Sequence, residues 1–281
     1  MLSVIIPSSN EESCIQACLD AIVRQSDLPT DHAIDVIVAA NGCDDQTVAH
    51  AEAKRSALND AGFELKVLDI AIGNKMNALN EGDAVAHHAS RVYLDADIVI
   101  SPRMLRELSD ILATDAPTYA SGSVRIPRPK SIVSRAYAKV WTDLPFIRDG
   151  VPGIGLYAVN GAGRARWAAF PKIYGDDRFV RLQFKPHERH KTKATHDWPL
   201  PEGFANLVHV RHRWREGNVE LAKAFPELED NESEFNKSFG NMLRLLRTPF
   251  SSAVFVTIYL VSNARARRSD AQGGFVWRRG R

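Results

Sequence analysis

The sequence predicts an α/β protein with a mostly parallel, Rossmann-like central sheet flanked by helices and a helical appendage at its C-terminal end. Two observations predict this class. Over the first 125 residues, short β-branched runs alternate with amphipathic segments of helical length. Polar turns follow the apolar runs, as they do where parallel strands end. At 281 residues the chain is long enough to bury one full core.

The first half contains four expected strands, at residues 2–6, 34–40, 63–70 and 91–94. Expected helices follow at 11–25, from a cap at Asp44 or Asp45 to about residue 60, and at 75–90. Ligands of such sheets bind beyond the carboxyl ends of the strands. The turns at residues 7–11, 41–45 and 95–97 should therefore lie together.

The second half is less regular. A strand is expected at 118–124, a helix reaching Trp141, a strand inside the glycine-rich stretch 150–163, and a helix opening at 174–180. Residues 185–202 are polar and without periodicity, which predicts a mobile loop, and 205–210 predicts another strand. Helices are expected over most of the remainder, including 235–247.

Bulk composition is typical of a soluble globular enzyme, with 44% hydrophobic and 25% charged residues. The net charge of +2 is too small to indicate a nucleic-acid partner. Three cysteines, Cys14, Cys18 and Cys43, match no disulfide framework or zinc pattern, so a cytoplasmic protein is expected. A strand beginning at Leu2 leaves no room for a signal peptide.

Two carboxylates separated by one small residue, Asp95 and Asp97, follow the buried run at 91–94. Neighbouring ionised groups repel each other and resist desolvation, so a positive charge is expected beside them. Magnesium and manganese sites use one or two carboxylates and let substrate phosphates complete the shell. The alternative is a capped turn at a strand end.

Five segments occur in the order and spacing of a known family. They are Ser3-Val-Ile-Ile-Pro7 with Asn10-Glu11-Glu12, Asn41-Gly-Cys-Asp-Asp-Gln-Thr47, Gly73-Asn-Lys-Met-Asn-Ala-Leu-Asn-Glu-Gly82, Leu94-Asp-Ala-Asp97 and Gly175-Asp-Asp177. Together they resemble the family 2 glycosyltransferases, which have the GT-A fold. The resemblance covers about residues 1–217: it implies a nucleotide-sugar half at 1–125, an acceptor half at 126–217, and an appendage at 218–281.

The resemblance implies a metal-dependent, inverting transfer of a hexosyl group from a UDP- or GDP-sugar to an acceptor hydroxyl. In this family pattern Asp97 matches the direct ligand of Mn²⁺ or Mg²⁺, and Asp95 would contact the ribose or reach the metal through water. Such a metal would stabilise the charge that develops on the departing diphosphate.

The nucleotide base is expected in the first two turns, where Pro7, Asn10 and Glu11 match the family. Asn41 departs from it, since the family usually has Asp there, and a preference for uracil or guanine therefore cannot be transferred. Lys75 matches a basic position near the nucleotide. The alternative for Lys75 is a solvated helix start.

An inverting displacement needs a general base that accepts the proton of the acceptor hydroxyl. By resemblance that base is Asp177, with Asp176 as the second candidate. Adjacent carboxylates raise each other's pKa, a direction that suits a proton acceptor. The alternative is that they cap the following helix, which would contribute about 1 kcal/mol.

Later segments supply the remaining candidates. Gly161 and Gly163 resemble the family's glycine-rich segment, where the sugar approaches the backbone; the alternative is a helix entry without a ligand. Arg211 and Arg213 could clamp the diphosphate and Trp214 could stack on the acceptor sugar, although a Trp there is more often core. Val210 stands where processive members carry Gln, which argues against a polymerising synthase. One late histidine could be a metal ligand, from His187, His190, His196, His209 and His212.

The apolar run 253–261 is less than half the roughly 20 residues that span a bilayer. Flanking arginines suit a peripheral position on the inner, anionic membrane surface, whereas the alternative is a packed helix or a homodimer interface. Expected partners are the donor and a glycan or lipid-linked acceptor. Two rival functions remain: a sugar nucleotidyltransferase, disfavoured because Pro7-Ser-Ser-Asn10 has no glycine, and an inactive scaffold, disfavoured by the retained acids.

Overall fold

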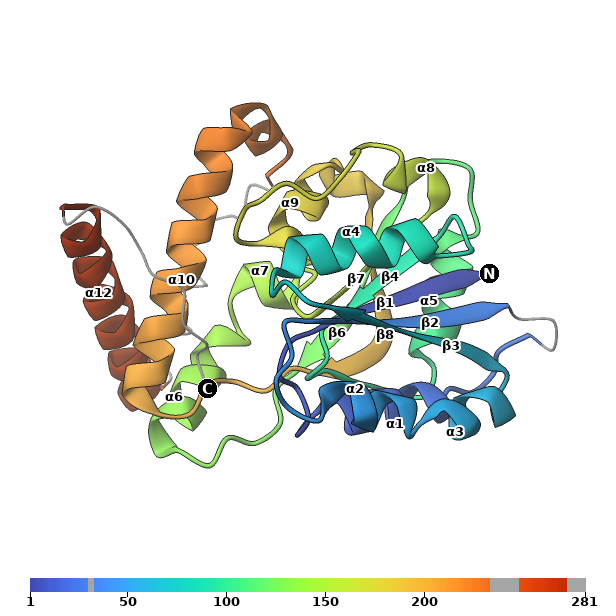
Figure 1. Cartoon of the computed structure of the whole chain (residues 1–281). Helices are drawn as coiled ribbons and strands as arrows, with labels where there is room; N and C mark the ends of the chain where they lie inside the picture. The colour runs from blue at the N-terminus through green and yellow to red at the C-terminus, as the bar shows by residue number, and fades with distance from the viewer. Residues whose placement is uncertain (30–32, 233–247, 272–281) are drawn as a thin grey trace.

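The protein is built around one twisted, eight-stranded sheet (Figure 1). The structure is a computed structural model that describes residues 1–29, 33–232 and 248–271, with side chains as far as Ala266. The strands are β1 (Leu2–Ser8), β2 (Ile34–Asn41), β3 (Phe63–Ile70), β4 (Arg91–Leu94), β5 (Val99–Ile100), β6 (Tyr119–Arg125), β7 (Leu156–Val159) and β8 (Arg189–Asp197). Their order in the sheet is β3-β2-β1-β4-β7-β6-β8-β5.

The parallel part of the sheet is β3-β2-β1-β4, as the alternation of β and α segments predicts. Strand β7 is antiparallel to both β4 and β6, β8 is parallel to β6, and β5 is antiparallel to β8. The mostly parallel α/β class is confirmed. Because β1 to β4 point the same way, their carboxyl ends define one edge of the sheet, called the carboxyl edge below, and their starts define the amino edge.

Alternating side chains of the strands feed two cores. Val4 and Ile6 pack against one set of helices, formed by α1 (Ile15–Val23), α2 (Thr47–Glu52), α3 (Arg55–Asp60) and α5 (Met104–Leu112). Ile5 and Ile37 pack on the opposite side against α4 (Lys75–Val85) and α9 (Asp176–Leu182). This period-2 alternation is what a strand requires when both faces are covered.

A separate layer of three helices lies beside the sheet (Figure 1). It contains α6 (Ile132–Trp141), α10 (Gly203–Ala224) and α12 (Pro249–Ala271), packed through Tyr137, Leu207 and Ile258. The shorter pieces are α7 (Pro145–Arg148), α8 (Gly161–Arg164) and the 3₁₀ turns η1 (Pro186–Glu188) and η2 (Pro226–Asn231). The appendage boundary predicted at residue 217 falls inside α10. Within the described ranges, no helix combines the length and hydropathy that a membrane span needs.

Two predictions in the second half are wrong. Residues 189–197, expected in a mobile loop, form strand β8. Several of its buried positions hold polar side chains, which form hydrogen bonds within the protein. Arg189 donates to the carbonyl of Phe184 at 3.0 Å, and the Thr192 hydroxyl donates to the carbonyl of Ala194 at 2.8 Å. Residues 205–210, expected as a strand, begin helix α10. A segment of six residues fits either structure, and here Leu207 and Val208 pack in the helical layer while Val210 is also buried.

The expected helix at 235–247 lies outside the described residues. The apolar run 253–261 lies within α12. Cys14, Cys18 and Cys43 are all reduced thiols that form no disulfide with described residues.

Candidate functional site

Asp95 and Asp97 stand where β4 ends, at the carboxyl edge. The Asp95 backbone N–H donates to the carbonyl of Gly155 at 2.9 Å, and the Ile98 N–H donates back to the carbonyl of Asp95 at 3.1 Å. Gly155 has φ +71°, and a Cβ there would lie 2.6 Å from Ile98 Cδ1. The turn that carries both acids is therefore held by β4, β7 and a glycine that has no room for a side chain.

Lys75 joins this turn to the start of helix α9. It is the first residue of α4, whose N-terminus is capped by the Asn74 side chain. Lys75 Nζ lies 2.8 Å from Asp95 Oδ1 and 2.9 Å from Asp176 Oδ1. The Tyr157 hydroxyl donates to the other oxygen of Asp176 at 2.9 Å. The turn after β4 and the start of α9, which are distant in sequence, thus each place a carboxylate against this lysine.

Asp176 and Asp177 occupy the first turn of α9, directly after Gly175, which has φ +95°. Asp176 is 6% exposed, whereas Asp177 is only partly buried and accepts the N–H of Arg178 at 2.8 Å. Carboxylates are favourable in the first turn of a helix. Capping and a chemical role are therefore compatible. Asp95, Asp97, Asp176 and Asp177 are called the acid cluster below.

Desolvation favours the protonated form of two of these acids, Asp95 and Asp177. Desolvation raises the pKa of Asp95 to about 6, with Lys75 opposing the shift and Asp176 adding to it. Desolvation and the neighbouring Asp176 likewise raise the pKa of Asp177 to about 6. Desolvation lowers the pKa of Lys75, but Asp176 and Asp95 outweigh it and leave that pKa above its ordinary value. Lys75 therefore stays charged, while Asp177 can exchange a proton near neutral pH.

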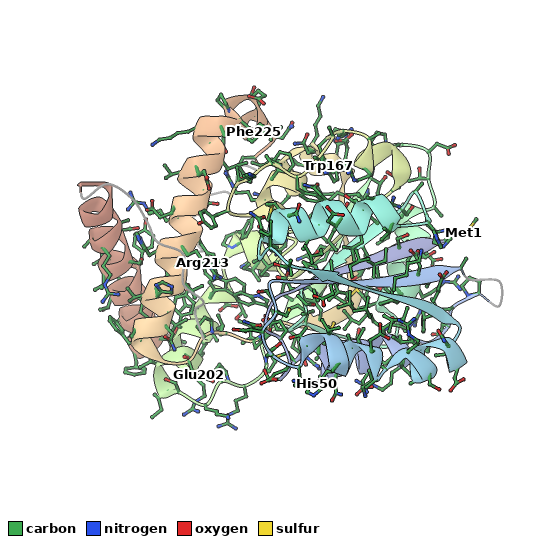
Figure 2. All side chains as sticks on the ribbon, viewed as in Figure 1. Met1, His50, Trp167, Glu202, Arg213 and Phe225 are labelled. Atoms are coloured by element: carbon green, nitrogen blue, oxygen red, sulfur yellow. The ribbon has the colours of Figure 1, made fainter. Side chains whose placement is uncertain are left out.

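Arg213 adds a second cation from helix α10. Burial lowers the pKa of its guanidinium, and the carboxylates of Asp95, Asp177 and Asp97 counteract that shift. In Figure 2 it lies along α10, between Glu202 and Phe225 at the two ends of the helix. Arg213 thus interacts with the acid cluster, and its predicted role as a clamp for the diphosphate stays a prediction.

Arg211, predicted to act with Arg213, lies elsewhere. Among the described contacts its guanidinium donates to no carboxylate. It donates to the Tyr137 hydroxyl at 2.9 Å and stacks over Phe255 and Tyr259. Residues two apart on an α-helix point about 200° apart, so both arginines cannot face the acid cluster. Trp214 packs against Trp198, with ring centroids 5.8 Å apart.

The first two turns are tied to each other at the same edge. The buried Asn41 side chain donates to the carbonyls of Ser8 and Ala39, at 2.8 and 3.3 Å. Asn10 has φ +53°, and its side-chain oxygen accepts the N–H of Asp44 at 2.9 Å.

Glu11 joins the same arrangement, since its N–H donates to the Thr47 hydroxyl at 2.7 Å. Pro7 is buried within β1. The structure therefore brings the four residues predicted for a base pocket, Pro7, Asn10, Glu11 and Asn41, to the edge that also holds the acid cluster.

Gly161 and Gly163 are not brought to this site, which corrects the expectation of a sugar contact there. In the β4–β7 register, Val159 lies opposite Arg91 at the start of β4, so the following glycines lie at the amino edge. A Cβ on Gly161 would lie 2.9 Å from Ala89, and one on Gly163 would lie 2.8 Å from Phe184. The helix-entry alternative fits: Asn160 caps α8 by accepting the N–H of Gly163 at 2.9 Å.

That amino edge carries a charge network of its own, called the amino-edge network below. Asp83 accepts from Arg91 at 3.1 Å, from Arg164 at 3.0 Å and from the Tyr93 hydroxyl at 2.9 Å. All three charged side chains are at most 19% exposed. The Tyr93 and Tyr157 rings stack with centroids 4.9 Å apart, so the two networks meet through a pair of aromatic rings.

Sequence reasoning missed Tyr157 and Gly155. Neither belongs to a motif that was singled out, and only the pairing of β7 with β4 places them beside the acids. The one sequence signal for these two residues is the cluster of glycines around residues 156–160, which by resemblance indicates Gly161 and Gly163 instead.

The donor set at the carboxyl edge fits a hard divalent cation in part. Among the described residues, no group of three or more His, Cys, Asp or Glu could enclose a metal. Asp95 and Asp97 supply two carboxylates on one turn, and Mg²⁺ and Mn²⁺ are commonly held by one or two carboxylates plus ligand oxygens. The late histidines do not complete a set; His196 is buried and bonded to the carbonyl of Ile154 at 2.9 Å.

Comparison with known sequences gives a family match. A family model described as glycosyl transferase family 2 matches residues 3–150, more than half of the chain. The glycosyltransferase AglD of Haloferax volcanii is 32% identical over 145 residues, which cover 48% of this chain and 23% of that protein. An uncharacterized glycosyltransferase, EpsJ of Bacillus subtilis, is 29% identical over 112 residues, covering 39% and 30%. The matched part thus spans less than a third of either relative.

Solved structures share the fold. The mannosyltransferase PcManGT of Pyrobaculum calidifontis, in complex with GDP-Man and Mn²⁺, aligns with TM-score 0.60 at 18% identity and covers 98% of this chain and 76% of that one. Glucosyl-3-phosphoglycerate synthase of Mycobacterium tuberculosis, in complex with Mn²⁺, UDP and its product, aligns with TM-score 0.53 at 17% identity and covers 79% of each chain. These likenesses confirm the GT-A fold.

Proposed function

This chain is a member of glycosyl transferase family 2, and on that premise we propose that it moves a single sugar from a UDP- or GDP-sugar to an acceptor hydroxyl with inversion. The observation that carries the proposal is the convergence of the acid cluster with Lys75 and Arg213 at the carboxyl edge. Four carboxylates and two cations leave an excess of negative charge. A cation-bound diphosphate would compensate it.

The departing nucleoside diphosphate would be stabilised by fixed positive charge. Lys75 is held at 2.8 Å from Asp95, and Arg213 of helix α10 interacts with the same carboxylates, so both cations are positioned before a ligand arrives. A Mn²⁺ or Mg²⁺ ion held by Asp97, with Asp95 beside it, would supply Lewis-acid charge to the same phosphates. The neighbours that carry Mn²⁺ with GDP-Man or UDP support this choice of metal and donor.

Asp177 is proposed as the general base. Its carboxylate would accept the acceptor's hydroxyl proton while that oxygen bonds to the anomeric carbon. The bond from this carbon to the diphosphate oxygen breaks on the opposite face, and the oxygen keeps the electron pair. The raised pKa of Asp177, about 6, suits a proton acceptor that works near neutral pH. Asp176 is less suited because Lys75 and Tyr157 already bind its oxygens.

The base of the donor would lie over the first two turns. Because both amide hydrogens of Asn41 are directed at the carbonyls of Ser8 and Ala39, its Oδ1 would be the group presented to a base. Uracil and guanine both carry a ring N–H that such an oxygen can accept. The substitution of Asn for the usual Asp therefore retains either base, and the donor remains UDP- or GDP-linked in this proposal.

The acceptor is proposed to be a glycan or lipid-linked precursor of cell-surface polysaccharide, receiving one sugar per transfer. Val210, in the position where processive members carry Gln, supports single transfer. Gly161 and Gly163 lie at the amino edge, so they are not part of the proposed acceptor site.

The decisive test combines binding with turnover. Titration calorimetry of the purified chain with UDP and with GDP should show affinity that depends on Mn²⁺. A screen of UDP- and GDP-sugars should find one donor from which nucleoside diphosphate is released, and proton NMR should show the opposite anomeric configuration in the product.

Matched variants make this test specific. Asp97→Ala should abolish the Mn²⁺-dependent part of nucleotide binding. Asp115→Ala, at an exposed acid on the amino-edge side of the sheet, should leave it unchanged. Metal-independent nucleotide binding in the wild type, or equal binding by both variants, would remove the metal from the proposal. If no donor released nucleoside diphosphate, the inactive scaffold would be the remaining alternative.

A further inference from the structure

Exposed apolar side chains are concentrated on the helical layer. Among the described residues, ten large hydrophobic side chains are exposed, and seven of them belong to α6, α10 and α12. These seven are Ile132, Phe204, Val219, Phe250, Val256, Tyr259 and Leu260. Large exposed apolar patches on a soluble protein mark interaction sites.

Helix α12 contributes a continuous apolar stripe on its outer side. Phe250, Val256 and Leu260 are 62%, 45% and 59% exposed, and the small residues Ala253 and Ala264 are exposed at compatible spacing. The opposite side packs inward through buried Ile258 and Ser262. No Asp, Glu, Lys or Arg occurs between residues 249 and 264. The helix is therefore apolar on the side facing away from the protein as well.

The first turns of the three helices lie at one end of the layer. The Glu202 carboxylate, just before α10, accepts the N–H groups of Lys130 and Ser131, just before α6, at 2.7 and 2.8 Å. Helices α10 and α12 run in the same direction, since Arg211 stacks over Tyr259 and Arg215 reaches the carbonyl of Asn263 one turn later.

Three large exposed apolar side chains lie in the first turns of these helices, at the end of the layer where the apolar stripe of α12 begins. They are Ile132 of α6, which is 63% exposed, Phe204 of α10 and Phe250 of α12.

Positive charge borders this apolar face. Arg128 and Lys130 are exposed beside the start of α6, Arg135 is partly exposed on its first turns, and Arg265 is exposed near the far end of α12. The carboxylate that faces this group is Glu202, which is already bonded to backbone N–H groups.

A basic hollow of about 480 Å³ lies between α10 and α12. Arg211, Arg215, Tyr259 and Asn263 line it, and its described lining contains no carboxylate. Arg211 Nε has no hydrogen-bond partner among the described residues. The hollow is thus suited to an anion rather than to another cation.

We propose that this face docks on an anionic lipid bilayer, with α12 lying in the interfacial plane and the hollow receiving a lipid phosphate. An apolar helix face sinks a few ångströms into the headgroup boundary, and bordering basic residues add attraction to anionic lipids. Charge complementarity selects this occupant over a second copy of the chain. A two-fold contact through the same face would set basic groups against one another. The docking does not depend on the proposed function.

Flotation of the full chain with lipid vesicles tests the docking without any assay of turnover. Binding to vesicles containing phosphatidylglycerol should exceed binding to pure phosphatidylcholine, and added salt should weaken it. Phe250→Ser with Leu260→Ser should lower it strongly. Arg128→Gln with Lys130→Gln should lower it by about fivefold for each cation removed. Ile72→Ser, which removes a 74% exposed side chain outside this face, should not change it.

Thermal melts identify variants that fail to fold. Arg215→Gln, which removes a positive charge from the hollow, should also lower binding to anionic vesicles. The proposal is overturned if anionic vesicles do not retain the protein, if neutral vesicles retain it equally, or if the folded variants all float like the wild type. It is also overturned if light scattering shows a dimer that the Phe250→Ser, Leu260→Ser pair abolishes while vesicle binding is absent.

Discussion

The amino-edge network sets one carboxylate, Asp83, against two guanidinium groups and a tyrosine hydroxyl, whereas the acid cluster sets four carboxylates against two cations. Asp83 is closed off from solvent and its partners satisfy it. At the carboxyl edge, Lys75 and Asp95 are still 38% and 37% exposed. The amino-edge network is buried and its carboxylate is neutralised, whereas the acid cluster keeps an excess of negative charge and stays partly open to solvent.

The largest expected effect lies in the acid cluster. Asp177→Asn should lower kcat by about 10²–10⁴-fold, because the acceptor proton loses its base. Donor affinity should change little, since Asp177 binds neither Lys75 nor Tyr157 in the described contacts. Steady-state kinetics with the cognate donor measures this. If Asp176→Asn abolished turnover while Asp177→Asn preserved it, the two acids would exchange roles.

The next effect lies in the amino-edge network. Asp83→Asn should lower the free energy of unfolding by about 3–5 kcal/mol, because it leaves Arg91 and Arg164 with no buried countercharge. Urea denaturation measures this. Asp20→Asn is the matched control: its partner Lys54 lies at 2.6 Å, but the pair is partly exposed, so the expected loss is within about 1 kcal/mol. Equal losses would show that the amino-edge network is no more stabilising than a surface pair.

The smallest effect is the pH dependence that Asp177 gives to activity and to stability. Because the folded-state pKa of Asp177 is raised to about 6, kcat/KM should fall about tenfold per pH unit below 6, whereas an unperturbed Asp would sustain activity to about pH 4. The folded protein binds this proton more tightly than the unfolded chain, so the contribution of Asp177 to stability increases as the pH falls from 7 to 5.

Activity and this contribution to stability should therefore change in opposite directions. Rate profiles and thermal melts across the same pH range check this, with Asp177→Asn as the reference for the melts. A rate profile that stays flat to pH 4.5 would contradict the role of Asp177.

The parallel half of the fold could be predicted because its strands are apolar on both faces and its helices are amphipathic. Strand β8 could not, since its buried positions hold Arg189, Thr192 and His196, whose burial depends on partners distant in sequence. Local pattern carries no information about such partners. The start of α10 was predicted wrongly for a different reason. Residues 205–210 are too few to distinguish the period of a strand from that of a helix.

The candidate site was predictable where a residue follows a strand directly. Asp95, Asp97 and Asn41 needed only the rule that parallel strands end at one edge. Gly161 and Gly163 follow an antiparallel strand, so they lie at the opposite edge, and the sequence alone did not reveal that reversal. Arg211 and Arg213 were predicted as a pair, and helical geometry separates them.

The stacked rings of Tyr93 and Tyr157 connect the two edges of the sheet. One hydroxyl is bonded to Asp83 and the other to Asp176, with ring centroids 4.9 Å apart. The two rings act as a spacer across the molecule, within the core on the side of α4 and α9. The turns that would recognise the donor base lie outside this spacer. Because the two rings belong to the core and the first two turns do not, substitutions in those turns would leave the separation of Asp83 from Asp176 unchanged.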